Sequence, residues 1–149
     1  MNYICSKKDS VMSVQEQESL KEKYYGEAVR YMDNTKNCLK KAKKEDNYYQ
    51  DPKYVKMVCG TAYCGILVAL DYFLILKGID NPKGKSKKSI EYYQENIIRI
   101  DEKMLGMLNS IYKVLHLLGY YDGITSVKVL NEGFIEAYKI IEKIRPAMS

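Results

Sequence analysis

The stretch MVCGTAYCGILVALDYFLIL, residues 57–76, decides the fold class, because Asp71 is its only charged side chain. Asp51 and Pro52 precede the stretch, and this pair is typical of the first residues of a helix. Gly78 follows it and favours the left-handed backbone that ends many helices. An apolar run of this length between such signals predicts one long helix that is apolar on every face.

Two placements of this apolar helix fit its composition. Its length matches a membrane span, with Lys56 before it and Lys77 after it. The polar groups of Thr61, Tyr72 and above all Asp71 instead favour a helix that is surrounded by other helices. We therefore expect the core helix of a soluble protein and no membrane contact, with the membrane span as the alternative.

Three other segments show apolar residues at every third or fourth position, the spacing of helices with one buried face. The first predicted helix covers residues 19–45, and Ser19 and Glu22 have the spacing of a capping box. Another covers residues 90–118, where an unbroken a/d seam continues over about four heptads. Gly119 is expected to end this helix.

The last predicted helix covers residues 125–144 and ends before Pro146, which cannot donate the next backbone hydrogen bond. No segment alternates polar and apolar residues over a convincing length, so no strand is predicted. The sequence therefore predicts an all-α fold, an antiparallel up-down bundle of four long helices. Residues 19–149 form this single domain, and residues 1–18 are expected to be a flexible N-terminal arm.

The composition excludes some classes of protein and indicates the cellular compartment. The 149 residues are 46% hydrophobic and 29% charged, which excludes a disordered chain and predicts one packed domain. The first residues lack the apolar run of a secretory signal, and the four cysteines form no CxxC motif, so we expect a cytoplasmic protein with free thiols. Phosphate-binding loops, EF-hand loops and zinc-protease motifs are absent from the sequence, and no cofactor or metal is expected.

Asp71 and Tyr72, near the end of the apolar helix, mark a candidate ligand pocket. A buried carboxylate is costly unless it is paired, so Asp71 is expected to bind a Lys or Arg from another helix or a Tyr hydroxyl. A role in ligand binding is the alternative. His116 is the only imidazole, and the sequence offers no obvious partner that would make it a general base. No catalytic residue and no enzymatic activity are therefore predicted.

Lysines gather in two places along the chain. The residues considered for anion binding are Lys40, Lys41, Lys43 and Lys44 in the first group and Lys83, Lys85, Lys87 and Lys88 in the second. Such groups neutralise the phosphates of nucleic acids. The net charge is only +5, however, and lysines interspersed with carboxylates also serve as a solvated face. The solvated face is our first interpretation, and nucleic-acid or other anion binding is the alternative.

Fifteen tyrosines and no tryptophan make Tyr the large aromatic residue of this protein. Tyr combines apolar area with a polar tip, which suits bundle edges and protein interfaces. The last predicted helix is shorter than the one before it and is expected to leave the start of that helix uncovered. We therefore predict a homodimer. Its expected interface comprises Tyr92, Tyr93, Ile97 and Ile98. A monomer whose terminal arm or connector covers this segment is the alternative.

The order of these features resembles the HEPN-like helical bundles of prokaryotes. The resemblance covers residues 19–145 and includes the runs AYCGI at residues 62–66 and EGFIEAY at residues 132–138. Ribonuclease members of that group carry an Arg shortly before a His, whereas His116 here lies seventeen residues after Arg99. The resemblance therefore implies a non-catalytic member, which dimerises or pairs with a nucleotidyltransferase-type partner. A small bacterial helical family of unknown function fits the same features.

The predicted function is that of a non-catalytic interaction or scaffold protein, with a second copy or an unidentified protein as its partner. The alternative is a nucleic-acid-associated or toxin–antitoxin-like protein of the HEPN type, which would use the two lysine groups.

Overall fold

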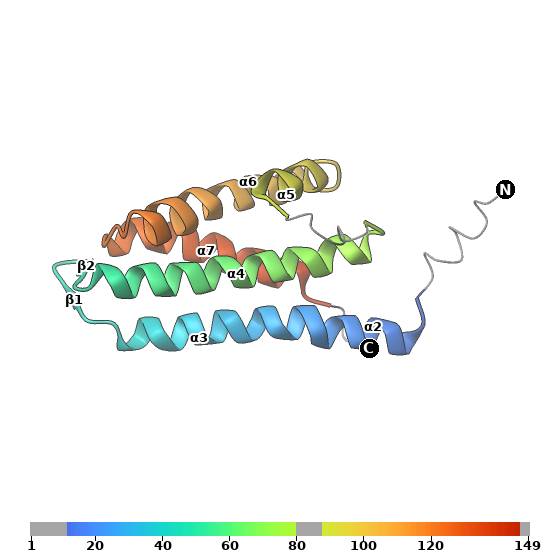
Figure 1. Ribbon diagram of the computed structural model, residues 1–149, viewed down its shortest axis with the longest axis horizontal. Helices are drawn as coiled ribbons and strands as arrows, with labels where there is room; N and C mark the ends of the chain where they lie inside the picture. Colours follow the sequence, from blue (N-terminus) through green and yellow to red (C-terminus); the bar gives the residue numbers. More distant parts are fainter. Residues whose placement is uncertain (1–11, 80–87, 147–149) are drawn as a thin grey trace.

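The computed structural model describes residues 12–79 and 88–146, and these form a bundle with four arms (Figure 1). Short π-helical segments, labelled η, continue two of the helices. In chain order the elements are α2 (Val14–Leu20), η1 (Lys21–Gly26), α3 (Glu27–Lys41), β1 (Lys44–Glu45), β2 (Tyr48–Tyr49), α4 (Pro52–Leu76), α5 (Ile90–Ile97), α6 (Glu102–Ile111), η2 (Tyr112–Tyr121) and α7 (Val127–Ile144). The first arm of the bundle consists of α2, η1 and α3, the second of α4, the third of α5, α6 and η2, and the fourth of α7.

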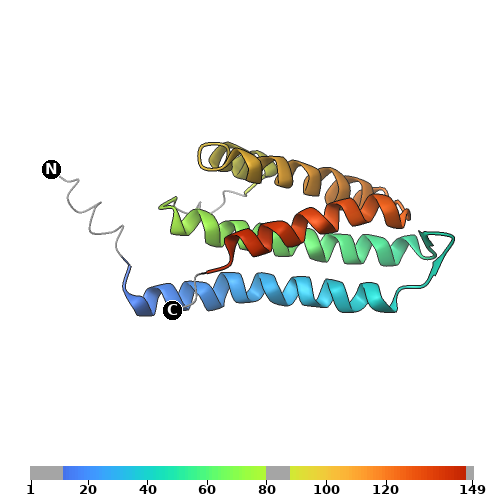
Figure 2. The same ribbon diagram turned by 180° about the vertical axis from the view of Figure 1, so that it is seen from behind.

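Helix α4 lies in the middle of the bundle. In Figure 1 α3 runs below α4 and α6 above it, while α7 lies behind it. Figure 2 shows the molecule from behind, with α7 in front of α4. Contacts of α4 with elements of all three other arms agree with these views. The predicted all-α class is confirmed, and the small hairpin of β1 and β2 is the only departure from it among the described residues.

The bounds of α4 are those that the sequence indicated. The backbone N–H of Lys53 donates to Asp51 Oδ1 at 3.0 Å, so Asp51 caps the helix. Pro52 occupies the first turn, where its missing N–H is not needed. After the helix, Gly78 adopts a φ of +82°, a left-handed conformation that glycine reaches without strain.

Side chains of α4 form the centre of the hydrophobic core. Ile66, Leu70 and Leu74 are all fully buried. Among the described residues α4 alone is long and apolar enough to cross a membrane, but 56% of its most apolar window is buried inside the bundle. Burial of this part of α4 by the neighbouring helices is typical of a core helix.

The first arm begins earlier than predicted. Ser13 caps α2, which starts at Val14, so the expected start at Ser19 is wrong. The backbone N–H of Glu16 donates to Ser13 Oγ at 3.0 Å, and the N–H of Ser13 donates to Glu16 Oε1 at 2.8 Å. This reciprocal pair is a capping box, formed six residues before the predicted one. Residues 1–11 of the N-terminal segment that was predicted to be flexible (residues 1–18) lie outside the described residues.

The first arm also ends earlier than predicted, at Lys41. Asp46 and Asn47 follow with φ values of 52° and 68° and make the turn between β1 and β2. Two left-handed residues in a row give the hairpin turn whose twist matches that of its strands. The N–H of Tyr49 then donates to the carbonyl of Thr125 at 2.8 Å. The hairpin is thereby fixed to the loop before α7 and covers one end of the bundle.

The third arm is not one continuous helix, contrary to the prediction. Helix α5 ends at Ile97, and α6 begins at Glu102. Between them Asp101 accepts a hydrogen bond from the backbone N–H of Met104 at 3.0 Å. Its other carboxylate oxygen lies 3.1 Å from Lys143 Nζ on α7. The apolar heptad spacing continues across this break, so the pattern alone does not reveal it.

We expect Asp101→Ala to lower the free energy of unfolding by about 1 kcal/mol at neutral pH, because a helix cap is lost. The N–H of Met104 is the main cause that holds the pKa of Asp101 below its usual value. A lowered pKa means that this stabilisation is present above the ordinary carboxylate pKa and is lost as the pH falls through the folded-state pKa. Urea unfolding at neutral and at acid pH measures the effect, and a difference that persists undiminished in acid contradicts it.

Segment η2 continues the third arm past Gly119, which was expected to end it. Gly119 is buried against α4, and a Cβ atom at this position would lie 2.8 Å from Cβ of Cys59. The missing side chain therefore allows η2 and α4 to approach each other closely. π-Helical segments are rare and frequently occur at functional sites.

Candidate functional site

The buried carboxylate of Asp71 is paired within the protein. The Tyr93 hydroxyl donates to Asp71 Oδ1 at 2.9 Å, and Lys88 Nζ lies 2.9 Å from the same oxygen. Burial, and after it the charge of Asp71, raises the pKa of Tyr93, so its hydroxyl remains protonated as the donor. The expected pairing of Asp71 with a lysine and a tyrosine is therefore observed, and it joins α4 to the start of α5.

Tyr72, the second residue of the candidate pocket, belongs to the core. It is 3% exposed, and its ring centroid lies 5.8 Å from that of Tyr25. The Tyr25 hydroxyl donates to the carbonyl of Ile141 at 2.8 Å, which connects the first arm to α7. The two hollows described below are lined by other residues. Asp71 and Tyr72 thus contribute to the packing of α4, and a ligand-binding role for them stays a prediction.

We expect Asp71→Ala to lower the free energy of unfolding by about 1–3 kcal/mol, because the Tyr93 hydroxyl and the Lys88 ammonium lose their shared acceptor. Tyr93→Phe is the matched variant, since it removes the donor and keeps the ring. In the Tyr93→Phe background the change at Asp71 should cost at least about 0.5 kcal/mol less, because groups in direct contact are coupled. A double-mutant cycle by chemical denaturation measures this coupling, and strictly additive losses would contradict the bond.

Aromatic rings line one side of η2, and His116 lies at their centre. The His116 ring centroid is 4.4 Å from that of Tyr63 on α4, 5.2 Å from Tyr112 and 5.8 Å from Tyr120. Burial lowers the pKa of His116, so the ring is neutral at neutral pH. Its described contacts are ring contacts, which give His116 a packing role.

The predicted dimer interface at the start of the third arm is largely buried in the protein itself. Tyr93 is 2% exposed and Ile97 is 0% exposed, so the expectation that both lie uncovered is wrong. The physical reason is the helix break, because α5 is a separate helix whose inner face carries both side chains. Tyr92 is half-buried against Tyr93, with 5.2 Å between the ring centroids. Ile98, in the turn after α5, is 50% exposed and alone of the four offers a large uncovered apolar side chain.

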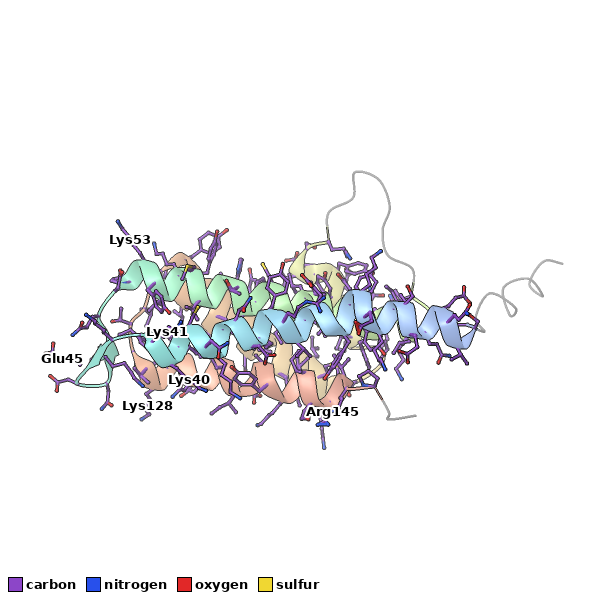
Figure 3. The ribbon with its side chains drawn as sticks, turned by 90° about the horizontal axis from the view of Figure 1, so that it is seen from below. Lys40, Lys41, Glu45, Lys53, Lys128 and Arg145 are labelled. Atoms are coloured by element: carbon purple, nitrogen blue, oxygen red, sulfur yellow. The ribbon has the colours of Figure 1, made fainter. Side chains whose placement is uncertain are left out.

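Lysines gather at the end of the bundle that the hairpin covers (Figure 3). The first predicted group lies here, and the tertiary structure adds Lys53 and Lys56 from α4 and Lys128 from α7. We call this surface the basic end. Its members are Lys40, Lys41, Lys43, Lys44, Lys53, Lys56 and Lys128. All seven are exposed, and none forms an ion pair with a described residue.

The second predicted lysine group is not part of this surface. Lys88 binds Asp71 on the side of α4, which makes it a structural cation instead of a free anion-binding group. Lys83, Lys85 and Lys87 lie outside the described residues.

A groove of about 480 Å³ runs between the third arm and α7. Val114, Leu118 and Val129 form its floor, since they are buried or half-buried. Lys113 lies on the η2 side of its rim and Glu132 on the α7 side, and both are exposed. No sequence signal indicated this groove, because its two sides come from separate helices.

Comparison with known proteins places the chain in a family. Residues 23–146 match the family described as Domain of unknown function (DUF5618). The chain belongs to the DUF5618 family. The structure is similar to that of a protein of unknown function from Dyadobacter fermentans, with a TM-score of 0.72 and 39% sequence identity. The match covers 89% of this chain and 97% of the other, whereas no curated protein matches the chain.

The DUF5618 match contains the candidate sites in full. The basic end, the groove beside η2 and the paired Asp71 all lie between residues 23 and 146. The expectation of a small helical family of unknown function is thereby confirmed. The resemblance to HEPN-like bundles stays a prediction, since neither comparison carries it.

Proposed function

We propose that this DUF5618 protein is a non-catalytic interaction module that pairs with a second copy of itself through the groove between η2 and α7. The observation that carries the proposal is the groove itself, whose apolar floor lies between two charges of opposite sign, Lys113 and Glu132, neither of which is in an ion pair within the described part of the chain.

Apolar surface around the groove supports an interface. Ile135 lines the groove and is 55% exposed. Outside the groove lining, Leu117 on η2 and Ile124 in the loop after η2 are each 36% exposed. Large uncovered apolar side chains at a groove are typical of interaction sites.

The charges at the rim favour a second copy as the occupant. Glu136 is already paired with Lys139 at 3.0 Å, whereas neither Lys113 nor Glu132 forms an ion pair with a described residue. A two-fold axis across the groove would set Lys113 of each copy against Glu132 of the other. One surface patch would thus supply both halves of two ion pairs, as symmetric dimers require.

The chemistry of the described residues supports a role without catalysis. Three or more His, Cys, Asp or Glu side chains do not converge on any point of the described chain where a metal ion would fit. His116 is stacked among tyrosines, and Asp71 is held by Lys88 and Tyr93. The free thiols of Cys38, Cys59 and Cys64 suit a reducing cytoplasm, and the buried α4 suits a protein without membrane contact.

Light scattering on a sizing column tests the assembly. At tens of micromolar the protein should show twice its monomer mass of 17.3 kDa. Ile135→Asp should return it to the monomer mass while the circular dichroism spectrum is unchanged. Ile98→Asp is the matched control, because Ile98 is similarly exposed but lies away from the groove. A wild-type mass of 17.3 kDa, or dissociation by Ile98→Asp alone, would refute the groove as the interface.

A second candidate function is nucleic-acid association of the HEPN or toxin–antitoxin-like type. The observation that favours it is the basic end, where seven exposed lysines from three helices and the hairpin lie together. An unidentified protein partner would use the same exposed surfaces and is the remaining candidate.

A further inference from the structure

The basic end carries exposed tyrosine rings as well as lysines. Tyr48 of β2 is 55% exposed, and it pairs with Ser126 through a backbone bridge, two residues before Lys128. This bridge places an uncovered ring beside the lysines of the hairpin and of α7.

Two further rings lie on the η2 side of the same end. Tyr120 is 44% exposed and Tyr121 is 61% exposed. Gly60 of α4 faces the Tyr120 ring so closely that a Cβ there would lie 2.9 Å from it. Lys56 is one turn earlier on α4, and its Cε would lie 2.9 Å from a Cβ at Gly123, in the loop after η2. The Gly60 contact places the Tyr120 ring next to the part of α4 that carries Lys56, and Tyr121 lies beside Tyr120 with 5.3 Å between the ring centroids.

A hollow of about 210 Å³ opens among these lysines. Lys41, Lys43 and Gln50 contribute its hydrogen-bond donors, and Tyr49 and Tyr54 contribute its aromatic wall. The Tyr54 hydroxyl donates to the carbonyl of Cys38 at 2.6 Å, which fixes that wall. Two ammonium groups and an amide around a concave surface fit a phosphate group.

Carboxylates share the basic end but do not neutralise it. They are Glu45, Asp46, Asp51 and Asp122, against seven lysines. Asp51 lines the hollow, where one of its carboxylate oxygens accepts the Lys53 N–H at the start of α4. The end therefore keeps a net positive charge.

From this arrangement we infer that the basic end binds single-stranded nucleic acid, with lysines on backbone phosphates and Tyr48 as a stacking platform for an unpaired base. The inference rests on the second candidate function, nucleic-acid association, and it is independent of the homodimer, whose interface lies elsewhere.

The side chains present favour a single strand over other polyanions. Lysine is a point charge that neutralises phosphates, whereas reading of base edges mostly uses the planar group of Arg. The basic end contains no Arg, so binding with little sequence preference is expected. Exposed rings stack on unpaired bases, whose faces a duplex hides. A hollow with lysines at its edge admits a strand better than it fits the flat surface of a bilayer.

Fluorescence anisotropy with labelled oligouridine and oligothymidine tests the inference. Binding should weaken steeply with salt, with a log–log slope of about −0.7 for each phosphate contacted. Changing Lys40, Lys41, Lys43 and Lys44 together to Gln should lower the affinity at low salt at least about tenfold and flatten the slope. The control changes Lys77 and Lys103 to Gln, since these lie at the opposite end of the bundle, and should leave binding unchanged.

Tyr48→Ala should weaken single-strand binding about 5- to 150-fold and leave binding of a duplex of equal length nearly unchanged. Tyr48→Phe keeps the ring and should retain the affinity. Circular dichroism of each variant confirms that it is folded. The inference is overturned if oligonucleotides do not bind at low salt, if the control loses as much affinity as the basic-end variant, if Tyr48→Ala has no effect, or if anionic phosphatidylserine vesicles bind more tightly. Each of these results leaves the mass measured by light scattering unchanged, so it does not bear on the dimer.

Discussion

Leu70→Ala is expected to lower the free energy of unfolding by about 2–5 kcal/mol, because it leaves a cavity in the centre of the core. Leu70 is fully buried at 0% exposure and is among the largest side chains of the core. A domain of this kind is stable by only about 5–15 kcal/mol, so the loss will be evident in urea or thermal unfolding.

Leu76→Ala is the matched control for this change. Leu76 lies on the same helix and loses the same atoms, but it is 43% exposed. Its replacement should cost no more than about 0.5 kcal/mol, as is usual at surface positions. Equal losses at the two positions would mean that α4 is not the core helix of the bundle.

Helix α4 shows what the sequence predicts well. Because the helix is apolar on every face, it had to be covered either by other helices or by lipid. Pro52 favours the start of a helix and Gly78 the backbone conformation that ends one. Both signals are local, and the structure confirms both bounds. The pairing of Asp71 was likewise predictable in kind, since a buried carboxylate needs a partner. The identity of the partners, Lys88 and Tyr93, depends on how α5 folds back onto α4.

The third arm shows where pattern reasoning fails. An a/d seam continues from α5 into α6, so periodicity predicts one helix, while the side chain of Asp101 caps a new one. This error also placed Tyr93 and Ile97 on the surface, although α5 buries them. The π-helical segments have no periodicity signal of their own, and the role of Gly119 depends on Cys59 in another helix.

The candidate surfaces could be predicted only where their residues lie close together in the sequence. The lysines near the end of α3 stand close together in the chain and were identified, but Lys53, Lys56 and Lys128 join them through tertiary structure alone. Lys113 and Glu132 lie on different helices, and nothing in the sequence indicates that they face one groove.

The second large effect concerns assembly. In a two-fold dimer Lys113 of each copy would contact Glu132 of the other copy, so two equivalent ion pairs would form. Lys113→Glu alone, or Glu132→Lys alone, would set like charges against each other at both contacts. Like charges in contact across an interface cost several kcal/mol, so each variant by itself should be monomeric at concentrations where the wild type is a dimer.

An equimolar mixture of these two variants, measured by light scattering, tests the self-association most directly. In a heterodimer of Lys113→Glu with Glu132→Lys, both contacts again join an acidic to a basic side chain. The mixture should therefore recover twice 17.3 kDa, although each variant alone remains at 17.3 kDa. A mixture that stays at 17.3 kDa while the wild type dimerises, or single variants that remain dimeric, would contradict a dimer formed through the groove between η2 and α7.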